Sequence, residues 1–272
     1  MKKIIELTNR YIIIATPLLL FLFILSLYFM VTMNNVQVIK ILFGLILAFL
    51  MFVAFAAGWG NMIKSAVDEK NYDEPYLIIK DFAPGVGEFF LPVLGMVVFA
   101  LLIFSASLTF IYFTGMHFIG DSGVSAEALS KAMASSDALK SFLLTLNPGQ
   151  IVKLNLWNML IFSTLTLVYF IMIFYSPALF YESKNPFKAF WLSIKHLFGK
   201  KFILNAGIYL LIFCVNFLLS ILSAVFAKNN ILSFGISLAN FYFICCAAIG
   251  IFYYYNKNFV NLHLGNSIDT YI

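Results

Sequence analysis

The chain has 272 residues, of which 62% are hydrophobic and only 11% are charged, and its mean hydropathy is +0.96. An ordinary soluble domain is about one-quarter charged, so this composition excludes that class and leaves no room for a separate soluble domain. The formal net charge of +5 does not indicate nucleic-acid binding, because Arg10 is the only arginine and the lysines do not form one basic patch.

Six stretches without charged side chains are each long enough to cross a bilayer, which takes about 20 apolar residues in a helix. The spans predicted around them cover approximately residues 11–33, 39–63, 89–116, 154–181, 202–227 and 231–256. A core helix of a soluble protein would carry charges on its solvent face within a few turns. The sequence therefore predicts an all-α, polytopic membrane protein with a single membrane domain over residues 1–272.

The N-terminus begins like a secretory signal, with Lys2, Lys3 and Arg10 ahead of an apolar run. The run is too long for a signal and no small-residue cleavage site follows it, so an uncleaved first span is predicted. Within the spans, Pro17 and Pro177 are expected to kink the first and fourth helices.

Positive charge divides unevenly between the two ends of the spans. Twelve of the 17 basic residues lie in four segments, which are the N-terminus, residues 64–88, residues 182–201 and the C-terminal tail. The other connections carry 5. Lysine-rich loops stay in the cytoplasm, so both termini are predicted to lie on the cytoplasmic side of the membrane.

Two cytoplasmic segments are expected to be amphipathic and to lie at the membrane interface. In the first, Asp73-Glu74-Pro75-Tyr76 begins an apolar stretch that is expected to break at Pro84-Gly85. In the second, Asn185 can cap a helix that starts at Pro186 and ends near Gly199. Its apolar face consists of Phe187, Phe190, Trp191, Ile194, Leu197 and Phe198. The alternative is a short helix packed on the ends of the spans. The similar order of cap, proline and aromatic residue in both segments hints at an internal duplication.

The outer segment contains Gly120-Asp121-Ser122-Gly123, the string around the nucleophile of trypsin-like serine proteases. That chemistry needs a histidine and a buried carboxylate on a rigid β-scaffold, so a turn is the preferred interpretation. Residues 125–146 have helix-compatible composition, and Asn147-Pro148-Gly149 is expected to interrupt them before the fourth span.

One face of the fifth span is polar. It comprises Asn205, Tyr209, Asn216, Ser220 and Ser223. Amides in hydrocarbon need hydrogen-bond partners, so this face is expected to point inward. It either lines a substrate path or bonds to neighbouring helices, and packing is the preferred interpretation.

No catalytic, cofactor-binding or metal-binding residues are predicted. Asp, Glu, Lys and Arg are missing from the middle of every span, which disfavours a buried proton or ion relay. Cys214, Cys245 and Cys246 lack metal-ligand spacing, and the three histidines are too scattered to form one site. Glu182 and His196 are the only acid–base pair worth naming, although pairing of Glu182 with nearby lysines is preferred.

The stretch from Ser176-Pro177-Ala178 to Glu182, followed by Asn185-Pro186-Phe187-Lys188-Ala189-Phe190, Ser193 and Phe198, resembles an uncharacterised bacterial family of six-helix membrane proteins. That family is related to the membrane domain fused to glycerophosphodiester phosphodiesterases. The resemblance covers residues 169–213 and implies a six-span bundle in the bacterial cytoplasmic (inner) membrane, with a link to lipid or envelope homeostasis. It supplies no catalytic residues.

Three functions remain open at the level of the sequence. The first is a non-catalytic protein that assists transport or envelope and lipid homeostasis. The second is a transporter of a lipid-like or small amphipathic substrate, and the third is a membrane enzyme acting on lipid headgroups through Glu182 and His196. The expected partners are membrane lipids and, in addition, other membrane proteins or a separate ATPase, because no phosphate-binding loop is present. No nucleic acid is expected.

Overall fold

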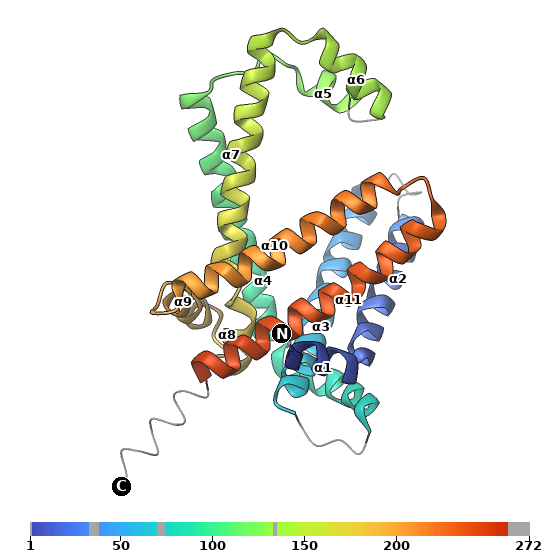
Figure 1. Cartoon of the computed structure of the whole chain (residues 1–272), viewed down its shortest axis with the longest axis vertical. Helices are drawn as coiled ribbons and strands as arrows, with labels where there is room; N and C mark the ends of the chain where they lie inside the picture. The colour runs from blue at the N-terminus through green and yellow to red at the C-terminus, as the bar shows by residue number, and fades with distance from the viewer. Residues whose placement is uncertain (1, 33–37, 70–73, 133–134, 261–272) are drawn as a thin grey trace. The chain divides into compact units, whose positions relative to one another are not determined.

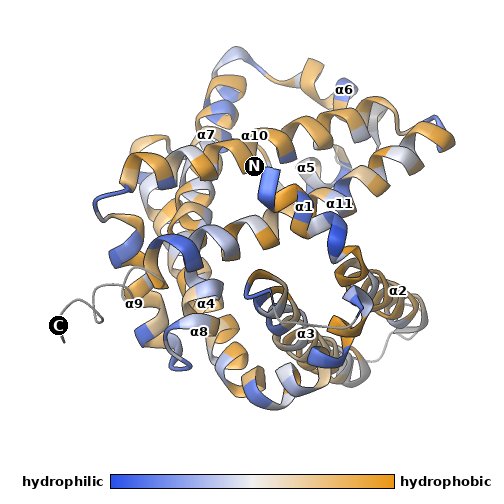
Figure 2. Ribbon diagram, turned by 60° about the horizontal axis from the view of Figure 1, so that its bottom comes forward, coloured by the Kyte–Doolittle hydropathy of each residue, from blue (hydrophilic) through white to orange (hydrophobic). Residues whose placement is uncertain are grey.

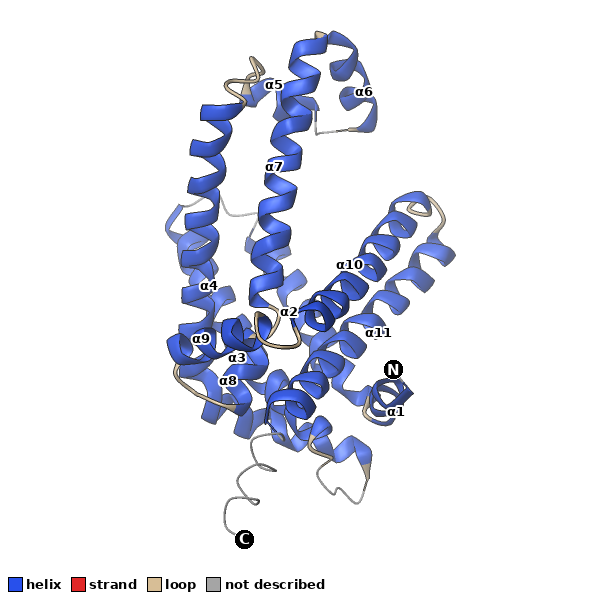
Figure 3. Cartoon of the chain, turned by 60° about the vertical axis from the view of Figure 1, so that its left-hand side comes forward, coloured by secondary structure: helices blue, strands red, loops and turns tan. Residues whose placement is uncertain are grey.

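The computed structural model describes residues 2–32, 38–69, 74–132 and 135–260. These residues form helices and connecting turns without any strand (Figure 3). Six segments among them are long and apolar enough to cross a membrane, which confirms the prediction of an all-α polytopic membrane protein.

The long helices are α2 (Ala15–Thr32), α3 (Val38–Val67), α4 (Phe82–Phe118), α7 (Pro148–Met172), α10 (Phe202–Val225) and α11 (Asn230–Tyr255). The short helices are α1 (Lys2–Arg10), α5 (Ala126–Ala132), α6 (Ser136–Thr145), α8 (Tyr175–Tyr181) and α9 (Pro186–Leu197). Two 3₁₀ segments, η1 (Ile12–Ile14) and η2 (Pro75–Asp81), and one π-helical turn, η3 (Asn256–Val260), complete the described elements. Hydrophobic residues dominate the long helices, as Figure 2 shows for α2 and α10.

The chain forms two compact units. Met1–Phe99 and Ile171–Ile272 make up the first, and Ala100–Phe170 make up the second, so that α4 and α7 each contribute to both. The single membrane domain expected from the sequence stays a prediction.

The third span begins earlier than the sequence predicts. Helix α4 starts at Phe82 and runs without interruption through Pro84 and Gly85. The expected break at Pro84-Gly85 is therefore wrong, because a proline in the first turn of a helix gives up an N–H that has no partner there. A Cβ at Gly85 would lie 2.5 Å from the Cβ of Asn61, so glycine allows the close approach of α4 to α3.

The two prolines expected to kink helices lie at the start of helices and not in their middle. Pro17 lies in the first turn of α2, directly after η1, and Pro177 lies in the first turn of α8. The fourth predicted span is consequently two helices, because α7 ends at Met172 and α8 begins at Tyr175. The expected disruption near Pro177 is present as a break ahead of the proline instead of a bend at it.

Aromatic packing joins the helices of the first unit. The rings of Phe21 and Phe55 are stacked with centroids 4.5 Å apart, which fixes α2 against α3. Trp59 adds a hydrogen bond of 2.9 Å from its indole N–H to the carbonyl of Ile14. On the opposite flank of α3, a Cβ at Gly60 would lie 2.3 Å from the Phe180 ring, so only glycine lets α8 come this close.

The described parts of the four segments that the sequence assigns to one side of the membrane meet at one end of the first unit (Figure 1), and the C-terminal segment is described only as far as Val260. Near the N-terminus, Lys3 forms an ion pair of 2.9 Å with Glu69, and this hydrogen bond raises the pKa of Lys3 above its usual value. Asp68, just after α3, accepts hydrogen bonds from Tyr181 and Asn256. Which face of the membrane this end occupies stays a prediction.

In the second unit, the string that resembles a protease nucleophile is a turn. Gly120 and Gly123 have φ of +73° and +69°, values that favour glycine, and the Asp121 side chain accepts from the N–H of Gly123 at 2.9 Å. Lys153 and Trp157 of α7 donate to the carbonyls of Asp121 and Gly120. The preferred interpretation as a turn is confirmed.

The expected interruption at Asn147-Pro148-Gly149 is also present, and it starts a helix. Helix α6 ends at Thr145 and α7 begins at Pro148. The side chains of Asn147 and Gln150 each accept from the other residue's backbone N–H, at 2.8 and 3.1 Å. This reciprocal pair satisfies backbone donors that the first turn would otherwise leave without partners.

Candidate functional site

Helix α9 begins as the sequence predicts. Asn185 accepts hydrogen bonds from the N–H groups of Phe187 at 3.0 Å and Lys188 at 3.2 Å, and Pro186 occupies the first helical position. The corresponding segment η2 also has a proline at its start, but it is a 3₁₀ helix without a side-chain cap. The two segments share the position of their proline and not their type of helix, and the internal duplication stays a prediction.

The apolar face expected on α9 divides into an exposed part and a buried part. Phe187, Trp191 and Phe198 are 66%, 68% and 54% exposed, whereas Leu197 is fully buried. Phe190 and Ile194 lie between these extremes.

Small residues, which are not part of the apolar face predicted from the sequence, make the packing surface of α9. Ala189 and Ser193 are fully buried together with Leu197 at four-residue steps. Phe190 packs edge-on against Tyr175 of α8, with ring centroids 5.3 Å apart. Helix α9 thus packs on α8 through this narrow stripe and Phe190, and it leaves Phe187 and Trp191 exposed.

A cluster of polar side chains holds the C-terminal end of α9. We call it the Glu182 cluster and define it as Glu182, His196, Asn205, Tyr254 and Tyr255. Glu182 Oε1 lies 2.9 Å from His196 Nε2, so the imidazole N–H donates to the carboxylate, and the Tyr255 hydroxyl donates to the same oxygen. Both side chains of the ion pair are largely buried, with 13% of His196 and 19% of Glu182 exposed.

Asn205 is the central tie between three helices. Its side-chain N–H groups donate to the carbonyls of His196 at 3.0 Å and Leu197 at 2.9 Å, which satisfies the last turn of α9. Its side-chain oxygen accepts from the Tyr254 hydroxyl of α11 at 2.7 Å. Asn205 is fully buried, so the packing role that the sequence analysis preferred describes this residue.

The rest of the polar face on α10 does not point inward. Tyr209 is half-buried, and Asn216, Ser220 and Ser223 are exposed. The Ser220 hydroxyl donates to the carbonyl of Asn216 at 2.9 Å, inside its own helix. The expectation of an inward-facing stripe therefore holds for Asn205 and is wrong for the last three residues. Residue spacing shows that these side chains share one helix face, but it does not show which neighbouring helices that face meets.

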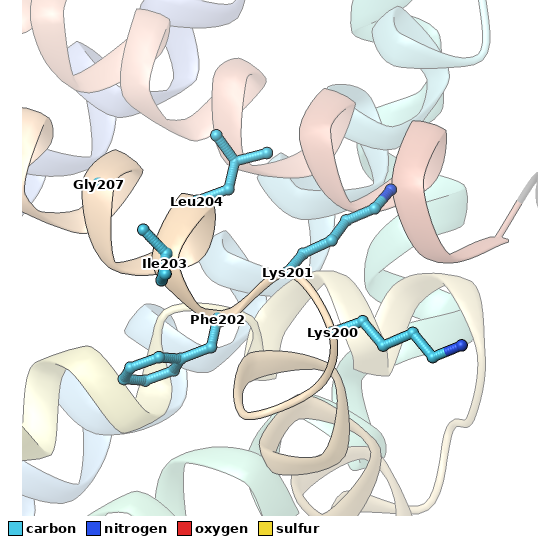
Figure 4. A pocket seen from close by; sticks show the side chains of 6 residues that line it. All are labelled: Lys200, Lys201, Phe202, Ile203, Leu204 and Gly207. Carbon is cyan, nitrogen blue, oxygen red and sulfur yellow. The ribbon is translucent and has the colours of Figure 1, made fainter.

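An open hollow of about 670 Å³ lies where α9 passes into α10 (Figure 4). Its lining residues are Lys200, Lys201, Phe202, Ile203, Leu204 and Gly207. The Lys201 ammonium donates to the side chain of Asn258 at 2.8 Å, and Figure 4 shows Phe202 and Lys200 extending to different sides of the turn. The transporter hypothesis expected a cavity lined by Asn205, Tyr209 and Asn216, and none of these lines the hollow.

Within the part of the chain that the structure describes, no group of three or more His, Cys, Asp or Glu side chains could hold a metal ion. His117 lies on α4 beside Phe118, and His196 belongs to the Glu182 cluster. His263 lies outside the described residues. Cys245 is buried and Cys214 is exposed, and both are free thiols.

The sequence analysis named Glu182 and His196 as a pair but missed the two tyrosines that complete the cluster. Tyr254 and Tyr255 end α11, far along the chain, and the aromatic run Phe252-Tyr253-Tyr254-Tyr255 gives no spacing signal toward Glu182. Phe259 was missed as well, and its ring stacks on His196 at 4.5 Å.

No family profile, curated protein or solved structure matches the chain in the three comparisons made. The resemblance to the bacterial six-helix family therefore stays a prediction.

Proposed function

We propose that the chain is a non-catalytic, multi-pass membrane protein that assists transport or envelope and lipid homeostasis, with α9 as its working surface. The observation that carries the proposal is that α9 has one side held by the rest of the chain and one side that is exposed. One side and both ends of the helix are fixed by Asn185, by Asn205 and by the Glu182–His196 hydrogen bond. The other side presents Phe187, Trp191 and Phe198 outward.

The bonding of the Glu182 cluster supports a structural role. A single carboxylate oxygen of Glu182 accepts from both His196 and Tyr255, which joins α8, α9 and α11. One face of the imidazole is covered by Phe259, which is itself only 8% exposed. None of these residues lines the hollow beside α10. The hydrogen bonds and ring contact of these side chains hold the ends of the helices together.

A second candidate is a membrane enzyme that acts on lipid headgroups. One observation favours it: Glu182 Oε1 and His196 Nε2 are 2.9 Å apart, the separation at which a carboxylate orients an imidazole for acid–base work. In that arrangement Nδ1 of His196 would exchange the proton with the substrate.

A complementation experiment separates the two candidates. A strain that lacks the chain is expected to become sensitive to detergent, and the wild-type protein should restore its growth. Glu182→Gln keeps an oxygen that accepts from His196 and Tyr255 but removes acid–base chemistry. A scaffold should retain growth within about twofold, whereas loss of a general acid or base lowers a rate by about 10²–10⁴.

Tyr255→Phe serves as the matched control, because it removes one hydrogen bond to the same oxygen without changing the acid–base pair. Protein amounts in the membrane are compared by immunoblot. Strong loss with Glu182→Gln and none with Tyr255→Phe, at equal amounts, would overturn the non-catalytic proposal in favour of the enzyme. A strain without the chain that grows normally in detergent would overturn the homeostasis role.

We also propose that the end of the first unit holding the Glu182 cluster lies in the cytoplasm of a bacterial cell. The uneven distribution of lysines supports this placement, as does the meeting of the described parts of the four segments at one end. A cysteine introduced at exposed Lys184 and one introduced at exposed Ser125 test it. An impermeant thiol reagent added outside cells should label the second and spare the first, and the reverse pattern would refute the orientation.

A further inference from the structure

We propose that the exposed side of α9, continued onto the start of α10, is a docking surface for the anionic headgroups of a lipid bilayer. We call it the α9 face and define it as Phe187, Lys188, Trp191, Lys195, Phe198 and Phe202. The inference rests on the proposed membrane placement and names the partner of its working surface.

The aromatic residues form one continuous stripe. At 100° per residue, Phe187, Trp191 and Phe198 fall within a sector of about 40° on the helix. The Phe198 ring stacks on that of Phe202, with centroids 5.6 Å apart and planes 15° apart, and Phe202 is 41% exposed. The stripe therefore extends across the turn between α9 and α10. Aromatic side chains of this kind favour the boundary between headgroups and hydrocarbon.

Lysines border the stripe on one side. Lys188 and Lys195 are seven residues apart and both exposed, so they share the sector next to Trp191. Lys200 adds a third exposed ammonium at the turn. An aromatic stripe with lysines at its border places apolar rings into a leaflet while the ammonium groups remain at phosphate level.

Charge complementarity identifies the occupant as anionic. Between Glu182 and Asp269 the chain contains no carboxylate side chain, so nothing within this segment neutralises its lysines. Lys184 is the exception in the neighbourhood, because Glu88 pairs with it at 2.9 Å. Lysines near an anionic surface each contribute about fivefold to binding.

The α9 face is also fixed in advance. The Asn185 cap holds its first turn, and Asn205 satisfies the carbonyls of its last turn. Ala189 and Ser193 are fully buried on the opposite side. Because the helix is already formed and anchored, contact with lipid does not have to repay the entropy of folding it.

The experiment uses the full chain with Trp59→Phe and Trp157→Phe, so that Trp191 is the only tryptophan. It is reconstituted into vesicles of phosphatidylcholine and phosphatidylglycerol in which one lipid or the other carries bromine on its acyl chains. Trp191 should be quenched by both, and more strongly by brominated phosphatidylglycerol. Lys188→Gln with Lys195→Gln should abolish that preference while quenching by lipid persists.

Equal quenching by the two brominated lipids would overturn the anionic selection. Quenching by aqueous iodide alone, or by neither reagent, would overturn the docking surface, since the face would then be in water or against protein. A second chain that keeps only Trp59, which lies on α3, serves as the reference for membrane placement. If brominated lipid quenches Trp59 but not Trp191, the docking surface alone is refuted. If it quenches neither tryptophan, the membrane placement on which the proposed function rests is refuted.

Discussion

Replacing Asn205 by alanine tests the view that the Glu182 cluster is a structural tie. The change removes two hydrogen bonds to the carbonyls of α9, at 3.0 and 2.9 Å, and one from the Tyr254 hydroxyl at 2.7 Å. A hydrogen bond contributes about 1 kcal/mol to stability, or about 0.6 kcal/mol on average in membrane proteins. The expected loss for three bonds is therefore about 2–3 kcal/mol of unfolding free energy.

The assay is equilibrium unfolding in mixed micelles with a rising fraction of denaturing detergent, followed by circular dichroism. Asn216→Ala on the same helix is the matched control, because Asn216 is exposed and the change should stay within about 0.5 kcal/mol. If Asn205→Ala destabilises the protein no more than Asn216→Ala, the hydrogen bonds of Asn205 do not hold the three helices and the reasoning is refuted.

Four further substitutions probe local packing and backbone conformation. Gly60→Ala should lower the free energy of unfolding by about 1–3 kcal/mol in the same assay, because its Cβ would lie 2.3 Å from the Phe180 ring. Gly87→Ala, with nothing within 4 Å of its Cβ, should instead raise it by about 0.5–1 kcal/mol. Gly123→Ala should cost about 1–2 kcal/mol at φ of +69° and speed proteolysis of the turn; an unchanged cleavage rate would contradict the strain. Asn147→Ala should cost about 1 kcal/mol and raise hydrogen exchange in the first turn of α7, and unaltered exchange there would rule out the cap.

The parts of the fold that the sequence predicts correctly depend on solvent and on local bonding. Long uncharged runs identify the spans, because lipid excludes charge over the full length of a helix. The Asn185-Pro186 start of α9 is equally local, since a cap bonds within three residues of itself. The break expected at Pro84 is wrong because Pro84 lies in the first turn of α4, where a proline does not interrupt the helix.

The candidate site was only half predictable, because its contacts join distant parts of the chain. Glu182 and His196 are close in sequence, and their pairing was foreseen as one alternative. Tyr255 is bonded to the same carboxylate across 73 positions, and no pattern within α11 points to it. On α9, periodicity finds apolar residues but not the buried side, which small Ala189 and Ser193 occupy so that the helix can approach α8 closely.

Lys64, at the cytoplasmic end of α3 in the predicted topology, shows how one residue serves two stages of the protein's life. In the predicted topology, its ammonium counts among the positive charges that keep this loop on the inner side during insertion. In the folded chain, the same ammonium donates to the carbonyl of Phe180 at 2.9 Å and lies over the rings of Phe89 and Tyr181. Its charge then binds a carbonyl near the end of α8 and not a lipid phosphate. A neutral substitute at Lys64 would therefore disturb both the predicted insertion of the nascent chain and the packing of α8, which is synthesised more than a hundred residues later.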